Sequence, residues 1–460
     1  MTSSGPTARR NAGRLRRRAV GLTVATSLVA AVSCGCAHTS PAPAEAAYGT
    51  HIDTNTPQGL RAKQLLDMVN SDWPIGTVTV GTLAAPEIIE PVARDMDRLW
   101  ADRPITVTGI DVGAGMARLH LRTSYAIDQE VELRTDDAGL VDRFEVTVDK
   151  PRIASWSDVD AELTKSGARY SYAASKVTNR TCTPVAGTHV DEPLPLASIF
   201  KLYVLLAVGQ AANAGTLGWD DPLLITKADK DVGSAGFDKL PPGSHVSVRE
   251  AAQQMISASD NMATDLLMTR VGPDAMHRAL VSAGHHDPAA MTPFPTAHEL
   301  FSIGWGRPDV RDEWRSATPA HRAEMLVRAN HIPYDPDPER TRTPASPYGI
   351  EWYGTAMDVC RVHAALQSEA TGRAAPIRDI LSATPGIDLD GEKWPYIAAK
   401  GGNLPGDISF SWYARDRTGQ GWVVSFQLNW PKYRSLAAAT WLLSVATAGF
   451  GMLPVGVPSR

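Results

Sequence analysis

The sequence lacks the motifs that bind phosphate groups or metal ions. It has no glycine-rich phosphate-cradling loop, and His285-His286 and His298-Glu299 do not have the spacing of a ligand set on one helical face. We therefore expect no metal and no cofactor. Removing the six arginines of the first 33 residues takes the formal net charge from -5 to -11, which argues against a nucleic-acid partner.

Acidic residues are absent from the first 33 positions, where arginines precede an apolar run from Ala19 to Val32. This run is too short and too rich in small residues for a stable membrane span, so residues 1–33 are predicted to be a secretory signal. Cys34 follows Ala-Val-Ser, which is similar to a bacterial lipobox, and we expect it to carry a lipid anchor to the cell membrane outside the cytoplasm. Cys36 as the lipidated residue, and an ordinary cleaved signal, remain alternatives.

Cysteine is scarce beyond this signal, where only Cys182 and Cys360 remain. The two lie far apart in the sequence and nothing in their spacing fixes a distance between them. An exported protein can join such a pair, but we favour two buried thiols.

At 460 residues the chain is long enough for two domains after the signal and a Pro- and Ala-rich tether over residues 34–56. Residues 57–150 predict helices followed by strands, and therefore a small α+β domain. The first helix begins at Thr56-Pro57 and has an apolar stripe of Leu60, Leu65, Leu66 and Val69. A second helix covers 85–100, and the strands cover 105–110, 117–125, 130–134 and 140–148. This segment has no group of residues typical of a catalytic site, so a spacer or packing role is favoured over a binding groove.

Residues 151–460 contain a candidate nucleophile. Ser198-Ile-Phe-Lys201 opens an uninterrupted apolar run, which predicts a buried helix that begins near Ser198. Lys201 lies one turn after Ser198, so its amine can reach the hydroxyl. A serine needs a base to become a nucleophile, and burial can keep a lysine neutral enough to serve.

Two further motifs follow in the chain. Ser259-Asp260-Asn261 comes 61 residues after Ser198, at the junction of two predicted helices. The first of these helices is predicted to begin at Ser247, with Glu250 three residues on as in a capping box. Lys400-Gly401-Gly402 ends the predicted strand 396–399, ahead of a hairpin over 408–415 and 422–429. We expect the two glycines to let the strand backbone approach a ligand.

The three motifs, in this order, resemble the active-site set of class A β-lactamases and penicillin-binding proteins. The resemblance covers about residues 158–453 and implies an α/β/α domain. It also implies that Ser198 is the nucleophile, Lys201 its base, Ser259 the proton shuttle to the leaving group, and Lys400 the cation that binds a substrate carboxylate.

The same resemblance assigns the remaining contacts to a small-molecule substrate. Asn261 would bind a substrate amide, Gly401 and Gly402 would border the substrate, and the backbone N–H groups of Ser198 and Asn403 would form the oxyanion hole. The substrate classes implied are β-lactams, esters and cell-wall fragments.

Two departures from the family pattern limit the expected activity. Gly401 stands where a hydroxyl residue usually binds the substrate carboxylate. The Glu-x-x-Leu-Asn segment that activates the deacylating water is missing, and Glu299 lies in what reads as the first turn of a helix, where glutamate is common. We therefore expect weak esterase or lactam-acylating activity.

With its two-domain order, the chain resembles the cephalosporin esterase of clavulanate gene clusters and the LpqF-type lipoproteins of actinobacteria. That resemblance implies an N-terminal domain of cyclase or steroid-isomerase type. Two alternatives stay open: a true class A β-lactamase with a displaced base, and a non-catalytic lipoprotein that binds cell-wall fragments.

Overall fold

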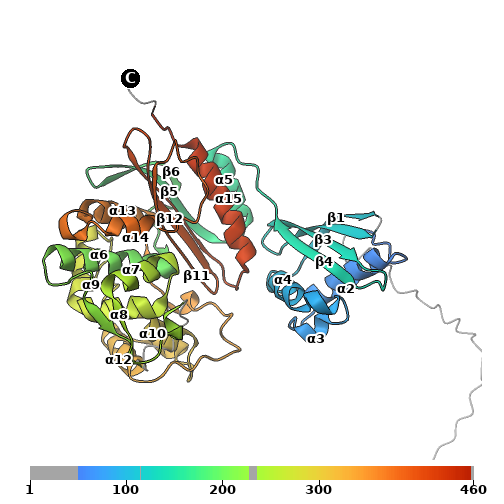
Figure 1. Ribbon diagram of the computed structural model, residues 1–460, viewed down its shortest axis with the longest axis horizontal. Helices are drawn as coiled ribbons and strands as arrows, with labels where there is room; N and C mark the ends of the chain where they lie inside the picture. The colour runs from blue at the N-terminus through green and yellow to red at the C-terminus, as the bar shows by residue number, and fades with distance from the viewer. Residues whose placement is uncertain (1–49, 114, 227–235, 457–460) are drawn as a thin grey trace, which may run out of the picture. The chain divides into compact units, whose positions relative to one another are not determined.

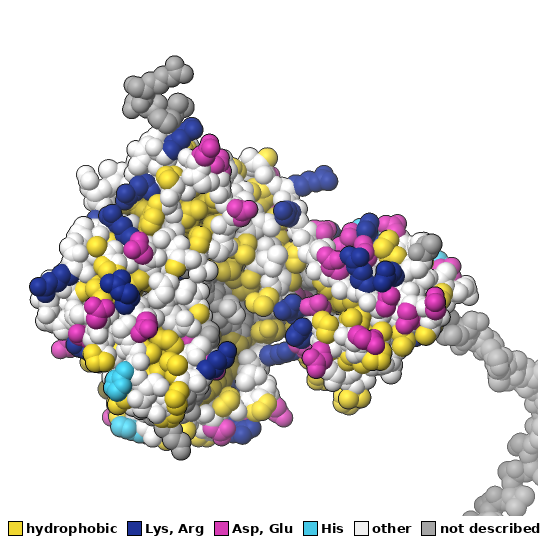
Figure 2. Space-filling model, in the orientation of Figure 1, with side chains coloured by type: hydrophobic (Ala, Val, Ile, Leu, Met, Phe, Trp, Pro, Cys, Tyr) yellow, Lys and Arg dark blue, Asp and Glu magenta, His cyan; other side chains and the backbone are white. Residues whose placement is uncertain are grey.

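The computed structural model of the chain describes residues 50–113, 115–226 and 236–456 (Figure 1). The expected signal, Cys34, Cys36 and most of the tether lie outside the described residues. Within the described part, no helix combines the length and apolar character needed to cross a membrane. On the face drawn in Figure 2, acidic and basic side chains are interspersed.

The N-terminal part has the expected order of helices followed by an antiparallel meander, with strand order β1-β2-β3-β4. Thr56 caps the first helix by accepting a hydrogen bond from the N–H of Gly59, and Pro57 occupies the first turn. Leu60, which we placed on the apolar stripe of this helix, is instead 49% exposed. The elements are α2 (Pro57–Val69), α3 (Thr77–Val80), α4 (Ile89–Ala101), β1 (Thr106–Gly113), β2 (Met116–Arg122), β3 (Asp128–Thr135) and β4 (Val141–Val148).

The C-terminal part is built around an antiparallel five-stranded sheet of order β11-β12-β13-β5-β6. Helices α5 and α15 pack on one face of this sheet, and α13 and α14 on the other (Figure 1). The strands of this sheet are β5 (Arg169–Thr178), β6 (Thr181–Thr188), β11 (Tyr396–Leu404), β12 (Asp407–Arg415) and β13 (Gly421–Asn429). The four helices on it are α5 (Trp156–Lys165), α13 (Ala356–Glu369), α14 (Ile377–Ser382) and α15 (Leu436–Met452). This arrangement is the expected α/β/α sandwich.

A helical subdomain lies between strands β6 and β11 in the chain. Its helices are α6 (Lys201–Asn213), α7 (Val248–Ser257), α8 (Asn261–Val271), α9 (Pro273–Ala283), α10 (Ala297–Trp305), α11 (Arg311–Ser316) and α12 (Pro319–Asn330). Two short strand pairs complete it: β7 (Leu194–Pro195) with β10 (Tyr353–Gly354), and β8 (Pro222–Leu224) with β9 (His245–Ser247). Ser247 and Glu250 form a capping box at the start of α7, as the sequence predicts.

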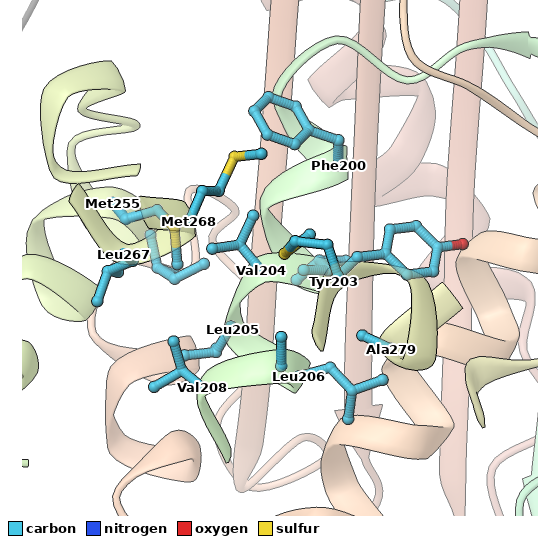
Figure 3. Close-up of a cluster of buried hydrophobic side chains, with 14 of the residues drawn as sticks. Phe200, Tyr203, Val204, Leu205, Leu206, Val208, Met255, Leu267, Met268 and Ala279 are labelled. Carbon is cyan, nitrogen blue, oxygen red and sulfur yellow. The ribbon is translucent and has the colours of Figure 1, made fainter. Parts of the chain in front are cut away.

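Helix α6 is the centre of the larger hydrophobic core. It is apolar on all sides, and residues 201–209 are all buried, which is typical of a helix surrounded by protein. Figure 3 shows Val204, Leu205 and Val208 of this helix among side chains from α7, α8 and α9. At its start, Phe200 stacks on Trp352 with ring centroids 3.7 Å apart. The segment that carries Ser198 is therefore held in a rigid setting.

The expectation of two free thiols is wrong. Cys182 on β6 and Cys360 on α13 form a disulfide, with their Cα atoms 6.2 Å apart. Their separation of 178 residues gave no indication of contact, because the whole helical subdomain lies between β6 and α13 in the chain. Strand β6 itself was not predicted.

Candidate active site

Ser198 lies on a short 3-10 turn (Ala197–Phe200) that leads directly into α6. Two hydrogen bonds fix the approach to this turn: the Leu196 N–H donates to the Trp352 carbonyl at 2.8 Å, and the Ser409 hydroxyl donates to the Leu196 carbonyl at 2.6 Å. Ala197 has a φ of 44°, in the left-handed region that a residue with a side chain rarely adopts. Such strain persists only where the surroundings impose it, and it often marks a functional residue.

Lys201 is completely buried, and its amine is held by three oxygen atoms. Its Nζ donates to the Ser259 carbonyl at 2.5 Å and to Asn261 Oδ1 at 2.7 Å, and it lies 3.3 Å from Ser259 Oγ. Burial lowers the pKa of Lys201 to about 7, against the attraction of Asp265 and Asp260. A neutral amine has two hydrogens, and the two carbonyl oxygens accept both. The third contact, with Ser259 Oγ, then involves the nitrogen lone pair, which can accept a proton from a hydroxyl.

Ser259 lies between α7 and α8, as predicted, and its hydroxyl joins the two amines. Lys400 Nζ donates to Ser259 Oγ at 2.9 Å, opposite the contact from Lys201. Ser259 has a φ of 56°, and the next residue, Asp260, caps α8 by accepting from the Ala263 N–H at 2.9 Å. The cap fixes where α8 begins and therefore where Ser259 and Asn261 stand.

Lys400 lies within β11, and not at the end of a strand as predicted, because β11 continues to Leu404. The side chain is 3% exposed, and its amine also donates to the Gly401 carbonyl at 2.6 Å. Burial, and to a lesser extent repulsion from Lys201, lower the pKa of Lys400 well below its ordinary value. The charged form that a carboxylate-binding role requires is thus disfavoured in the free protein.

The two glycines of β11 make room for other parts of the protein. A Cβ on Gly402 would overlap the backbone nitrogen of Ser198, so the strand backbone packs directly on the turn that carries Ser198. A Cβ on Gly401 would lie 2.6 Å from the ring of Phe410 on β12. The ring fills the space beside residue 401, where the family pattern has a hydroxyl. Asn403 follows in the same strand, opposite Ile408.

Glu299 lies in the first turn of α10, as the sequence predicts. Its carboxylate accepts from the Thr296 N–H at 2.8 Å in a capping box, and burial raises its pKa. This hydrogen bond accounts for the residue without a catalytic role.

Asp265 is a residue near the site that the sequence did not single out. Its two carboxylate oxygens accept from the N–H groups of Ala297 and His298 at 2.7 and 2.9 Å, at the start of α10. Among the charged groups that act on Lys201, Asp265 has the largest effect. No sequence signal marks this role, because it arises where α8 meets α10.

The structure brings Asp358, from α13, to His285 and His286, the pair whose spacing argued against a metal site. His285 Nε2 donates to the Tyr353 carbonyl at 3.0 Å, and its Nδ1 accepts from the Asp287 N–H at 3.1 Å. Asp358 accepts hydrogen bonds from the Thr355 and His286 N–H groups. A metal ion would have to displace these hydrogen bonds. The three residues therefore connect the loop after α9 to helix α13.

Comparisons with known proteins identify two segments. Residues 155–329 match the model described as the β-lactamase enzyme family, and residues 52–141 match the model described as ORF 12 gene product N-terminal. A search of curated proteins gives no match.

Three solved structures illustrate the structural similarity. A β-lactamase from Sphaerobacter thermophilus is 20% identical with a TM-score of 0.46, and the match covers 66% of this chain and all of that one. A mutant of PBP-A, solved as an acyl-enzyme complex with penicillin G, is 14% identical with a TM-score of 0.43 over 66% of this chain and all of that one. The chromosome-encoded β-lactamase of Vibrio parahaemolyticus is 15% identical with a TM-score of 0.44, covering 64% and 98%.

The family match contains Ser198, Lys201, Ser259 and Asn261, and it ends before Lys400. Residues 155–329 therefore form a β-lactamase-like segment.

Proposed function

We propose that the protein is a serine hydrolase that forms an acyl-enzyme on Ser198, with weak esterase or lactam-acylating activity. The observation that carries this proposal is the hydrogen-bonded network of Lys201, Ser259, Asn261 and Lys400 beside the backbone of Ser198. Its two amines and one hydroxyl come from elements far apart in the sequence. A network of this kind suits proton transfer to and from a nucleophilic serine.

The chemical steps follow from the donors and acceptors. The lone pair of Lys201 takes the proton of Ser198 Oγ as this oxygen bonds to the substrate carbonyl carbon. The N–H groups of Ser198 and Asn403 stabilise the oxyanion. As the carbonyl re-forms, the bond to the leaving group breaks, and Ser259 Oγ gives this group a proton and recovers one from the neighbouring amine. Lys400 becomes charged when a substrate carboxylate reaches it.

Release of the acyl group is the slow step in this proposal. The hydrogen bond in the α10 capping box occupies Glu299, the nearest counterpart of the family's deacylating glutamate. Esters of good leaving groups form an acyl-enzyme more easily than amides, so we propose an ester or a wall-derived acyl compound as the substrate.

We further propose that the protein is exported and held at the outer side of the cell membrane by a lipid on Cys34. The arginine-rich start and the short apolar run support this localisation. Labelling cells with a radioactive fatty acid should mark the wild-type protein and leave Cys34→Ala unlabelled. A label that survives in Cys34→Ala and disappears in Cys36→Ala would move the anchor to Cys36.

The two-part organisation supports a narrower relation to the cephalosporin esterase of clavulanate gene clusters and the LpqF-type lipoproteins. A matched N-terminal segment precedes the β-lactamase-like segment in the expected order. We propose a cyclase-like N-terminal domain that acts as a spacer.

Mass spectrometry tests the proposed chemistry. The protein is incubated separately with benzylpenicillin and with a cephalosporin acetyl ester, and the intact mass and the Ser198 peptide are measured. We expect a label on the Ser198 peptide, absent from Ser198→Ala. Failure of every such acyl donor to label Ser198 would favour the non-catalytic wall-binding alternative, and rapid turnover of nitrocefin would favour a true β-lactamase.

A further inference from the structure

Asp265 lies on the face of α8 that meets Lys201. Asn261 and Asp265 are four residues apart and therefore stand one above the other on the helix. Asn261 Oδ1 accepts from Lys201 Nζ at 2.7 Å, which orients this face toward the amine. The N–H groups of Ala297 and His298, at the start of α10, hold both oxygens of Asp265 and fix the carboxylate where α8 meets α10.

The charged groups around the amine come from three elements. Asp265 and Asp260 belong to α8 and its cap, and Lys400 belongs to β11. Asp265 itself faces Lys201 and, on α10, His298. Asp260 is committed to capping α8 through the Ala263 N–H. Asp265 is therefore the carboxylate whose charge can be removed while the turn at Ser259 keeps its cap.

We infer that Asp265 is a positioning residue for the proposed reaction: its negative charge stabilises the protonated amine of Lys201 and so sets the pH above which Ser198 can be acylated. This inference rests on the proposed function. The charge of Asp265 slows acylation at low pH, because it favours the protonated form of Lys201, and Lys201 must lose this proton to act as a base. At pH values well above the midpoint, where the amine is neutral with or without Asp265, the higher basicity that Asp265 gives to Lys201 favours transfer of the Ser198 proton.

The titration of the two groups supports the inference. The pKa of Lys201 is lowered to about 7, and burial raises the pKa of Asp265 to about 6, so the two groups change charge in adjacent pH ranges. Protonation of Asp265 removes its attraction for the ammonium group. The titration curve of Lys201 should therefore show, besides its main step near pH 7, a second and smaller step near pH 6.

The variant Asp265→Asn keeps the size of the side chain and one accepting oxygen but loses the charge. We expect the titration midpoint of Lys201 to fall by about one pH unit, as is usual when a nearby opposite charge is removed. The neutral fraction at pH 6 then rises, and acylation of Ser198 at that pH becomes about fivefold faster. A purely structural role for Asp265 would slow acylation at every pH without moving the midpoint.

The deciding experiment is an NMR titration of the full protein labelled with [ε-13C]lysine, with Lys201 assigned from the signal lost in Lys201→Arg. We expect a midpoint near pH 7 in the wild type, a lower one in Asp265→Asn, and unchanged values in Asp265→Glu and in Glu299→Gln, which alters a carboxylate that caps the same helix. An unchanged or higher midpoint in Asp265→Asn overturns the inference. If that variant does not fold, the absence of the change near pH 6 in the wild type overturns it.

This readout needs no catalytic activity. Failure of the wild type to acylate would refute the proposed function and still leave the Lys201 midpoint measurable. A normal acylation with no dependence of the midpoint on Asp265 would refute only the inference.

Discussion

Two sides of the site each supply one lysine: helix α6, the helical wall, carries Lys201, and strand β11, the strand wall, carries Lys400. The charges around the two lysines differ. Lys201, on α6, faces the carboxylates of Asp260 and Asp265, which partly offset the effect of burial. Lys400, on β11, faces the Lys201 amine, whose repulsion adds to the effect of burial in lowering the pKa of Lys400. The difference suggests a division of labour: Lys201 can lose and regain a proton near neutral pH, whereas Lys400 becomes charged when an anionic ligand binds.

Removing the amine of the helical wall should have the largest effect. Lys201→Ala takes away the base, and we expect acylation of Ser198 to slow by at least about 10³-fold. The rate of labelling by a p-nitrophenyl ester, followed by intact mass, measures this loss. Lys176→Ala, at an exposed position on β5, is the matched control and should label at the wild-type rate. Equal rates in the two variants would remove Lys201 from the mechanism.

Breaking the link between the walls should have the next largest effect. Ser259→Ala removes the hydroxyl that both amines contact, and we expect acylation to slow by about 10² to 10³-fold, as for other proton-transfer groups. Ser257→Ala, whose hydroxyl donates to the Gln253 carbonyl at the end of α7, should change the rate little. A loss below threefold in Ser259→Ala would show that the proton takes another route.

Removing the amine of the strand wall should have a selective effect. Lys400→Ala is expected to slow acylation by benzylpenicillin, which carries a carboxylate, by about 10- to 100-fold, because a charge-assisted hydrogen bond contributes about 1.5–3 kcal/mol. Acylation by a neutral p-nitrophenyl ester should fall by less than about fivefold on the same argument. Similar losses with both donors would contradict a carboxylate-binding role.

Substituting the glycines of β11 should have the smallest effects, and they should differ from each other. Gly402→Ala places a methyl group against the Ser198 backbone, and overpacking of this kind costs about 1–3 kcal/mol of stability. We expect a lower melting temperature and about tenfold slower acylation from a displaced nucleophile. In Gly401→Ala the Phe410 ring can turn aside, so the loss should be smaller. A larger loss in Gly401→Ala than in Gly402→Ala would show that β11 does not pack on the Ser198 turn at Gly402.

Local signals predicted much of the fold. Thr56-Pro57 and the Ser247 to Glu250 capping box act through bonds within one turn, so the sequence places these helix starts correctly. Strand β6 was missed because Pro184 and Gly187 interrupt its pattern, and an edge strand tolerates both. The disulfide and the length of β11 depend on partners that only the tertiary fold supplies.

The site was predicted where residue type and order were informative. The order of the motifs at Ser198, Ser259 and Lys400 indicated a shared pocket, and hydrogen bonds from Lys201 and Lys400 to Ser259 Oγ join the three motifs. Asp265 looked like an ordinary helix residue, because its effect depends on α10 and on the burial of Lys201. Burial and charge are properties of the assembled site, so a pKa near 7 cannot be read from the sequence.

The central claim is that burial turns Lys201 into a base for Ser198, and the acylation rate of Ser198 measured from pH 5 to 10 tests it most directly. Because the neutral amine is the active form, the rate should be low below pH 6, rise with pH, and reach half its maximum near pH 7. A midpoint near the ordinary lysine value of about 10.4, or a rate that does not change with pH, would contradict the account.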